Sequence, residues 1–181
     1  YELLDEIVPL FPGRFFHIGG DECLKDKWEV CPACQARIAA EGLKSDEEFT
    51  AEQKLQSYAV GRMEKILEKY GKKLVGWDEI LEGGLSPDAT VMSWRGNAGG
   101  IEAAHQHHNV IMSPTSHCYI DYYQLADRSK QPACEGGFVS VSKMYSFDPI
   151  PQEIPEDEKK YMLAQEKCIR ASRYFDLFMH Y

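Results

Sequence analysis

Short apolar runs alternate with longer amphipathic segments along the chain. Residues 14–20 predict a buried strand, because Phe15, Phe16 and Ile18 lead into two glycines that end it. A polar stretch over residues 24–50 follows. It leads to a helix predicted over residues 51–70, closed by Gly71, whose apolar positions at helical spacing are Leu55, Tyr58, Met63, Ile66 and Leu67.

Two β-rich runs come next, over residues 73–77 and residues 90–94. Each run ends in a tryptophan, Trp77 in the first and Trp94 in the second. A loop with two glycines and a proline separates the runs, which is typical of a connection between two strands. We therefore predict two further strands whose last positions carry large aromatic side chains.

The remaining segments repeat the alternation. Residues 99–108 predict a helix, residues 110–113 a strand, and residues 119–123 an aromatic segment. A last helix is predicted after Pro155, with periodic positions at Tyr161, Leu163 and Cys168. The order of strand, loop and helix implies parallel strands that are joined by helical crossovers.

Two α/β folds arrange parallel strands in this way. In a (β/α)8 barrel the C-terminal ends of the strands form the active face, so polar and aromatic residues placed there converge on one cavity. A Rossmann-type sheet is the alternative, but no Gly-x-Gly-x-x-Gly phosphate loop follows any predicted strand. The pattern therefore favours the barrel.

Composition limits the size and the partners. The 181 residues, 44% hydrophobic and 12% aromatic, suit one globular core, so we expect a single domain over residues 1–181. A formal net charge of −9 without a Lys/Arg cluster argues against nucleic acid and favours an uncharged or cationic ligand. No apolar run approaches the roughly 20 residues of a membrane span, and residues 1–12 lack signal-peptide features.

The sequence predicts no metal site. Of the six cysteines, Cys31 and Cys34 alone have the spacing of a metal or redox pair. A structural zinc site usually needs four ligands, and no second pair follows, so structural or incidental cysteines are favoured over zinc. The histidines at positions 105, 107 and 108 are interpreted as an exposed helix end, because adjacent side chains point apart.

Asp21 and Glu22 are the candidate chemical centre. They are adjacent acids at a predicted strand end, after Gly19 and Gly20, and successive side chains diverge, so they need not share one task. One carboxyl group, kept protonated in a drier environment, would donate to a leaving group while the other stayed ionised and stabilised positive charge. Without further context, a solvated acidic turn is the simpler interpretation.

The context favours the chemical interpretation. Residues 17–22, His-Ile-Gly-Gly-Asp-Glu, resemble the signature of family 20 glycoside hydrolases, the β-N-acetylhexosaminidases, at the end of the fourth barrel strand. The resemblance continues through ordered motifs at Trp28, Cys31-Pro32-Ala33-Cys34-Gln35, Val75-Gly76-Trp77-Asp78-Glu79-Ile80, Trp94-Arg95-Gly96, Tyr119-Ile120-Asp121 and Tyr145-Ser146-Phe147-Asp148-Pro149. It implies a partial (β/α)8 TIM barrel, roughly strands 4 to 7 with their helices.

The resemblance implies hydrolysis of terminal non-reducing N-acetyl-β-hexosamine residues. Glu22 would protonate the glycosidic oxygen and later activate water, and Asp21 would orient the 2-acetamido group. The acetamido oxygen of the substrate would attack the anomeric carbon and form an oxazolinium intermediate, with retention of configuration. Tyr119 would donate a hydrogen bond to that oxygen. Because the nucleophile belongs to the substrate, no cofactor is expected.

The same resemblance assigns the substrate-binding residues. Trp77 and Trp94 would form two walls of the pocket, since flat aromatic surfaces suit the C–H face of a pyranose, although each would otherwise be interpreted as core. Asp121 resembles the acid that binds hydroxyls far from the anomeric carbon. His17 would tune or position the acids, although a core histidine fits nearly as well. The implied partners are glycans that contain N-acetylhexosamine, and the family favours an extracytoplasmic location.

The sequence departs from the family in two places. A complete barrel needs about 250 residues, and the family's arginine, histidine and aspartate on earlier strands have no counterpart among the 181 residues. Residues 166–181 contain no tryptophan, so the Trp-x-Glu motif of the eighth strand is also missing. We therefore expect the isolated chain to be inactive or very weak.

Two other functions remain open. A carbohydrate-binding remnant would keep Trp77, Trp94 and Tyr119 as a sugar platform without turnover. An open barrel fragment would self-associate through its unpaired strand edges. A metal-dependent hydrolase is disfavoured, because no histidines accompany the acids at ligand spacing.

Overall fold

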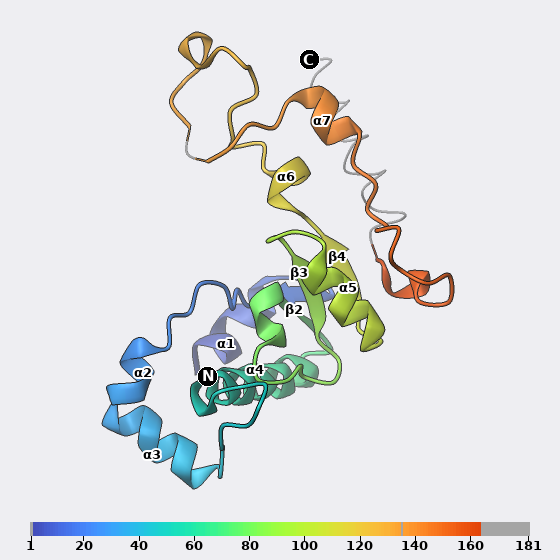
Figure 1. The fold of residues 1–181 in the computed structure, drawn as a ribbon. Coiled ribbons are helices and arrows are strands. Elements are labelled where there is room, and N and C mark those ends of the chain that lie inside the picture. Colours follow the sequence, from blue (N-terminus) through green and yellow to red (C-terminus); the bar gives the residue numbers. More distant parts are fainter. Residues whose placement is uncertain (1, 135, 164–181) are drawn as a thin grey trace. The chain divides into compact units, whose positions relative to one another are not determined.

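The computed structural model describes residues 2–134 and 136–163, whose elements are drawn in Figure 1. The helices and strands follow the chain as α1 (Glu2–Ile7), β1 (Phe15–His17), α2 (Asp26–Val30), α3 (Pro32–Ala40), α4 (Ala51–Lys69), β2 (Lys73–Trp77), β3 (Thr90–Ser93), α5 (Ala98–His105), β4 (Val110–Met112), α6 (Thr115–Cys118) and α7 (Val141–Tyr145). Single 3-10 turns lie at Val8–Leu10, Asp78–Leu81, Arg128–Lys130 and Lys159–Tyr161.

The four strands that the structure describes form one sheet in the order β1-β2-β3-β4, so neighbours in the sheet are neighbours in the sequence. β1 pairs with β2 in parallel, with Phe16 opposite Leu74 and His17 opposite Val75. Helices α2, α3 and α4 lie between these two strands in the sequence, as a parallel pair requires a long crossover. This is the strand and helix alternation of a β/α barrel.

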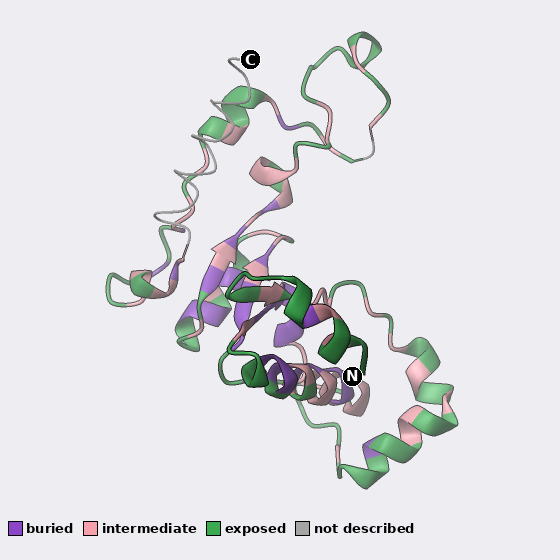
Figure 2. Cartoon of the chain, turned by 180° about the vertical axis from the view of Figure 1, so that it is seen from behind, coloured by how far each residue is buried: buried purple, intermediate pink, exposed green. Residues whose placement is uncertain are grey.

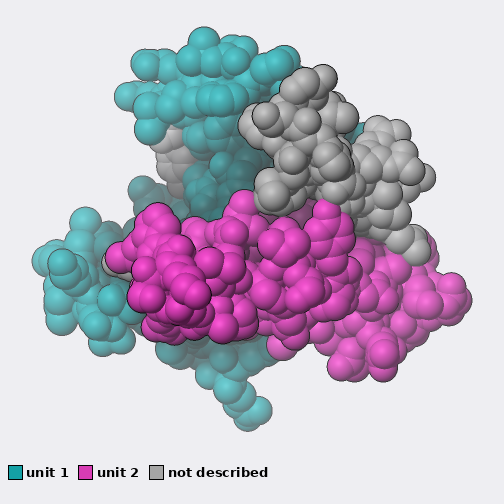
Figure 3. Space-filling view, turned by 90° about the horizontal axis from the view of Figure 1, so that it is seen from above, with its two compact units in different colours: residues 1–91 teal, residues 92–181 magenta. Residues whose placement is uncertain are grey.

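The chain divides into two compact units, residues 1–91 and residues 92–181, which Figure 3 distinguishes by colour. The division falls within β3. The expectation of a single domain over residues 1–181 stays a prediction. In the described part of the chain, no helix is long and apolar enough to cross a lipid bilayer.

Helix α4 confirms the helix predicted over residues 51–70. It begins with a capping box, in which the Thr50 hydroxyl accepts the N–H of Gln53 at 3.2 Å and the Gln53 side chain accepts the N–H of Thr50 at 2.8 Å. Gly71, with φ 65°, follows the end of the helix in the left-handed region. Figure 2 shows buried positions on this helix and on the strands, and those of α4 include Leu55, Val60, Ile66 and Leu67.

The prediction of a buried strand over residues 14–20 is wrong in extent and in burial. β1 is three residues long, and the side chains of Phe15 and His17 are exposed. The reason is its position in the sheet, because among the described residues β1 pairs with β2 alone and forms the edge. The glycines at 19 and 20 end the strand earlier than the apolar run suggests.

Helices α2 and α3 occupy the polar stretch of residues 24–50, for which no helix was predicted. Their exposed faces are wide, and Ile38 is the buried hydrophobic residue that they contribute. Too few apolar positions recur for a periodic signal. Pro32 at the first position of α3 was the available sign of a helix start.

The helix predicted after Pro155 is wrong over the described residues. A single 3-10 turn forms at Lys159–Tyr161, and Met162 then pairs with Val110 of β4 in a parallel bridge. The N–H of Leu163 donates to the carbonyl of Val110 at 2.9 Å, so the backbone is extended where a helix was expected. Cys168, which belonged to the same prediction, lies outside the described residues.

A buried carboxylate fixes the loop between β2 and β3 on α4. Glu64 is 6% exposed; its Oε2 accepts the hydroxyl of Ser86, and its Oε1 accepts the N–H of Asp88 at 3.1 Å. Ser86 is buried as well. Because buried polar groups must be paired, Glu64 supplies acceptors that the loop cannot supply itself.

We expect Glu64→Met to destabilise the chain by about 1–3 kcal/mol, because the volume is retained while the Ser86 hydroxyl and the Asp88 N–H lose their acceptor. Urea unfolding followed by circular dichroism measures the change. Glu64→Gln is the matched control, since its amide can still accept from Asp88 and donate to Ser86. Equal stability of the Met and Gln variants would contradict the prediction.

Candidate active site

The loop after β1 carries the two candidate acids and turns through left-handed backbone. Gly19 has φ 78° and Gly20 has φ 99°, a region that favours glycine. The pairing with β2 continues into this loop, because the N–H of Trp77 donates to the carbonyl of Gly19 at 2.9 Å. Asp21 and Glu22 therefore follow a backbone segment whose course is fixed by the neighbouring strand.

Close packing also requires glycine in this region. A Cβ atom at Gly20 would lie 2.7 Å from Cγ2 of Ile80, and a Cβ atom at Gly76 would lie 2.7 Å from the same carbon. Ile80 follows β2 and is completely buried. The two glycines therefore let the loop after β1 approach the loop after β2.

A buried glutamine that was not among the predicted site residues joins the two loops. Nε2 of Gln56, on α4, donates to the carbonyl of Gly20 at 3.2 Å and to the carbonyl of Glu79 at 3.3 Å. Gln56 is 5% exposed, next to buried Leu55. In the sequence, the position of Gln56 next to the apolar Leu55 was the one sign that its side chain could be buried. Gln56 fixes the backbone that immediately precedes Asp21.

Asp21 and Glu22 are both exposed. Glu22 has φ 46°, a conformation that non-glycine residues rarely adopt and that tends to persist at functional sites. Within the first unit neither carboxyl group is enclosed in the drier environment that a proton donor would favour. The left-handed backbone of Glu22, and not the burial of either side chain, distinguishes these acids from an ordinary acidic turn.

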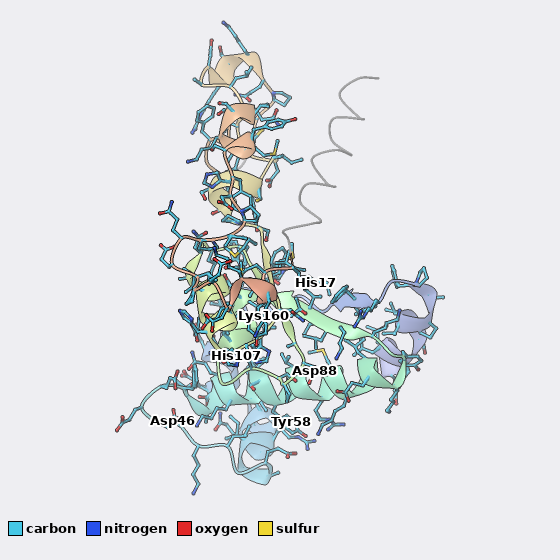
Figure 4. All side chains as sticks on the ribbon, turned by 90° about the vertical axis from the view of Figure 1, so that its right-hand side faces the viewer. His17, Asp46, Tyr58, Asp88, His107 and Lys160 are labelled. Carbon is cyan, nitrogen blue, oxygen red and sulfur yellow. The ribbon has the colours of Figure 1, made fainter. Side chains whose placement is uncertain are left out.

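His17, labelled in Figure 4, lies at the end of β1 and contacts the loop that follows. Its Nδ1 accepts the N–H of Gly19 at 3.0 Å, and its ring packs edge-on against Trp77, with ring centroids 4.8 Å apart. Burial of the ring against these neighbours lowers the pKa of His17 although part of the residue stays exposed, and the Asp21 carboxylate opposes the shift. The structure thus brings His17, Asp21 and Trp77 into one neighbourhood.

Two further acids in the first unit follow Trp77 and were assigned no role from the sequence. Asp78 is 1% exposed and Glu79 is 6% exposed, although both follow a strand end. Buried acids are uncommon, because removing a charge from water is costly unless it is paired. Burial is not visible in the sequence at these positions, since acids after a strand usually face solvent.

The second unit contains the other predicted site residues. Trp94 follows β3, and its ring stacks on Tyr119 with centroids 6.2 Å apart and an interplanar angle of 23°. The carbonyl of Trp94 accepts the N–H of Thr115 at 2.9 Å, which fixes the start of α6 beside the tryptophan. Tyr119 also contacts Tyr122, and Asp121 is exposed in the same loop. Within this unit Trp94 and Tyr119 are brought together.

The histidines at positions 105, 107 and 108 lie at or just after the end of α5, as predicted. Nδ1 of His105 lies 2.6 Å from Oε2 of Glu158, and the ring of His107 stacks on Tyr161 with centroids 5.3 Å apart. Both histidines are exposed, and His107 is labelled in Figure 4. Among residues 2–134 and 136–163, no three His, Cys, Asp or Glu residues are grouped so that they could hold a metal ion.

The parallel strands with intervening helices define part of a β/α barrel, and comparison with known proteins identifies its family. The model of the glycosyl hydrolase family 20 catalytic domain matches residues 1–170. The chain therefore belongs to the family 20 glycoside hydrolases, as the motifs predicted.

Two curated relatives illustrate the similarity. The chain is 50% identical over 166 residues to a beta-hexosaminidase of Porphyromonas gingivalis, and 32% identical over 157 residues to a beta-hexosaminidase of Vibrio furnissii. These matches cover 91% and 86% of the chain, but 20% and 24% of the two relatives. The chain thus spans less than a quarter of the length of either relative.

Solved structures confirm the fold. The chitobiase of Flavobacterium johnsoniae is 32% identical with a TM-score of 0.67, and the match covers 90% of this chain and 23% of that one. The exo beta-N-acetylglucosaminidase of Vibrio harveyi, solved in complex with N-acetylglucosamine, is 27% identical with a TM-score of 0.68, over 89% of this chain and 25% of that one. The predicted partial TIM barrel is correct.

We expect Asp21→Asn to lower the pKa of His17 further below its ordinary value of 6.5, because the Asp21 charge is the contribution that raises it. A depressed histidine pKa stabilises the folded chain above about pH 6.5, and that stabilisation is lost as the pH falls. NMR titration of the imidazole resonances measures the pKa values, and urea unfolding on either side of about pH 6.5 measures the change in stability. His117, whose pKa is lowered by burial and by Lys143, is the internal control and should not move.

An unchanged pKa of His17 in the Asp21→Asn variant would show that the carboxylate does not act on the imidazole. A shift of the same size in His117 would assign the effect to a general change of the fold.

Proposed function

We propose that this chain forms part of the catalytic barrel of a β-N-acetylhexosaminidase, an enzyme that removes terminal non-reducing N-acetyl-β-hexosamine residues from glycans. The observation that carries the proposal is the loop after β1. Two left-handed glycines and the left-handed Glu22 place adjacent acids at a strand end, in a chain of family 20. The names of its relatives, which are beta-hexosaminidases, support the same substrate class.

Each acid has one role in the proposed reaction. Glu22 protonates the glycosidic oxygen and later removes a proton from water. Asp21 orients the acetamido group of the substrate and stabilises the positive charge that develops on its nitrogen. The acetamido oxygen attacks the anomeric carbon, the glycosidic bond breaks, and water opens the oxazolinium intermediate with overall retention. No protein nucleophile is required.

The remaining residues bind the sugar in this proposal. Tyr119 donates a hydrogen bond to the acetamido oxygen, Trp77 and Trp94 contact the apolar surfaces of the sugar, and Asp121 binds distant hydroxyl groups. The stacking of Trp94 on Tyr119 supports a joint role for these two, because each ring limits the rotation of the other. His17 positions the acids through its bond to the Gly19 amide and its contact with Trp77.

The test is hydrolysis of a chromogenic N-acetyl-β-glucosaminide in two settings. In the first, the chain is assayed alone, where we expect little or no activity. In the second, its residues replace the matching segment of the Porphyromonas gingivalis relative, which supplies the rest of a barrel. We expect the chimaera to be active and Glu22→Gln to reduce kcat/KM about 100- to 10,000-fold, because the general acid and base is lost. An active Glu22→Gln chimaera would refute the assignment.

Attack by the acetamido oxygen of the substrate can be tested separately in the active chimaera, with a series of substrates that differ in the N-acyl group. Fluorination of the N-acetyl group withdraws electrons from the acetamido oxygen and weakens it as a nucleophile. We therefore expect kcat to fall progressively from the acetyl to the trifluoroacetyl substrate, and the glucoside without the acetamido group to remain uncleaved. Equal rates across this series would point to a protein nucleophile.

A carbohydrate-binding role is the second candidate, and the stacked Trp94–Tyr119 pair favours it. Binding of N-acetylglucosamine to the isolated chain, followed by tryptophan fluorescence, distinguishes this role from catalysis. Affinity that disappears in Trp94→Ala, without turnover in either setting, would support it.

A further inference from the structure

Two cysteines lie at the junction of α2 and α3, outside the residues proposed for catalysis. Cys31 ends α2, where its N–H donates to the carbonyl of Trp28 at 3.4 Å, and it is also the N-cap residue of α3. Pro32 is the first residue of α3 and Cys34 is the third. Both cysteines are free thiols with part of their surface exposed. A Cys-x-x-Cys pair at a helix start is therefore accessible from solvent.

The surroundings make the two thiols chemically unequal. Cys31 occupies the N-cap position of α3, although its side chain makes no capping hydrogen bond. The amide of Cys34, then the Cys34 thiol and the amide of Ala33, lower the pKa of Cys31. The same thiol–thiol interaction raises the pKa of Cys34. Cys31 is thus the better nucleophile of the pair, and Cys34 keeps its proton longer.

Side-chain hydrogen bonds hold both ends of α3 on its neighbouring helices. The side-chain amide of Gln35, next to Cys34, donates to the carbonyl of Trp28 and to Oε1 of Glu52, each at 2.9 Å. The hydroxyl of Tyr58, labelled on α4 in Figure 4, donates to Oε1 of Glu41 at the other end of α3 at 2.8 Å. These hydrogen bonds hold α3 on α2 and α4 without involving either thiol.

We propose that Cys31 and Cys34 form a reversible thiol–disulfide pair, in which Cys31 attacks and Cys34 resolves. The co-reactant is a low-molecular-weight disulfide. The Cys31 thiolate attacks one of its sulfurs, the S–S bond breaks and one small thiolate leaves. Cys34 then loses its proton and attacks the Cys31 sulfur, which expels the second thiolate. The two protein thiols lose two electrons, and the co-reactant becomes two thiols that take up the two protons.

Zinc binding is the other chemistry that this spacing serves. Over the described ranges, no third His, Cys, Asp or Glu joins the pair in a group that could hold a metal ion. A structural zinc site requires four ligands. The geometry thus favours redox exchange, and this proposal is independent of hexosaminidase activity.

The first test is redox titration of the whole chain in mixtures of reduced and oxidised glutathione, followed by alkylation and peptide mass spectrometry. We expect the peptide that contains both Cys31 and Cys34 to lose two hydrogens in a single reversible transition. Separate glutathione adducts on the two cysteines without an internal disulfide, or a disulfide from either residue to Cys23, would overturn the proposal.

The variants test the order of attack. Cys34→Ser should trap glutathione on Cys31, because the resolving thiol is gone. In Cys31→Ser, Cys34 should react with oxidised glutathione about tenfold more slowly at neutral pH than Cys31 does in Cys34→Ser, because the backbone amides that lower the pKa of Cys31 do not act on Cys34. Cys134 is the internal reference, and Cys31 should react about tenfold faster than it in the folded chain but at the same rate in concentrated urea. Equal rates for Cys34 in Cys31→Ser and Cys31 in Cys34→Ser, or a rate advantage of Cys31 that survives unfolding, would contradict the assigned roles.

Discussion

The hydrogen bond from the Trp77 N–H to the Gly19 carbonyl is the constraint on which the first unit's candidate chemistry depends. This bond continues the pairing of β1 and β2 beyond the last residue of β1. The backbone then turns through the left-handed Gly19 and Gly20 and leads directly into Asp21 and Glu22. Gln56 and Ile80 act on the same loop, one by hydrogen bonding and the other by contact. Strained backbone such as that of Glu22 persists where several interactions determine it together.

The electrostatics of this loop follow from the way His17 is held. Because Nδ1 accepts the Gly19 amide, the neutral ring carries its proton on Nε2 and can donate from that side. Burial is the larger influence on the pKa of His17 and favours this neutral form over an ion pair with Asp21. In the proposed reaction, a neutral imidazole would leave Asp21 available to stabilise the positive charge that develops on the acetamido nitrogen of the substrate.

The sequence predicts α4, β2, β3 and β4 to within a few residues, because their apolar patterns are strong and Gly71 marks the end of α4. Prediction from the sequence failed where tertiary contacts decide the outcome. β1 is exposed because of its place in the sheet, and Met162 is extended because it pairs with Val110. The candidate acids were found through a motif, whereas Gln56 was missed because its partners, the carbonyls of Gly20 and Glu79, are distant in sequence and leave no pattern.

The bridge between Val110 and Met162 affects which parts of the chain can change in length. The chain leaves β4 after Met112 and pairs with the same strand again at Met162. The segment between them is therefore a long loop whose two ends are both fixed at β4. The entropy of closing a loop grows only logarithmically, by about 0.6 kcal/mol for each doubling of its length. Changes in the length of this segment at exposed positions therefore cost little closure entropy, whereas the buried Val139 and Ile154 limit which of its residues can be replaced.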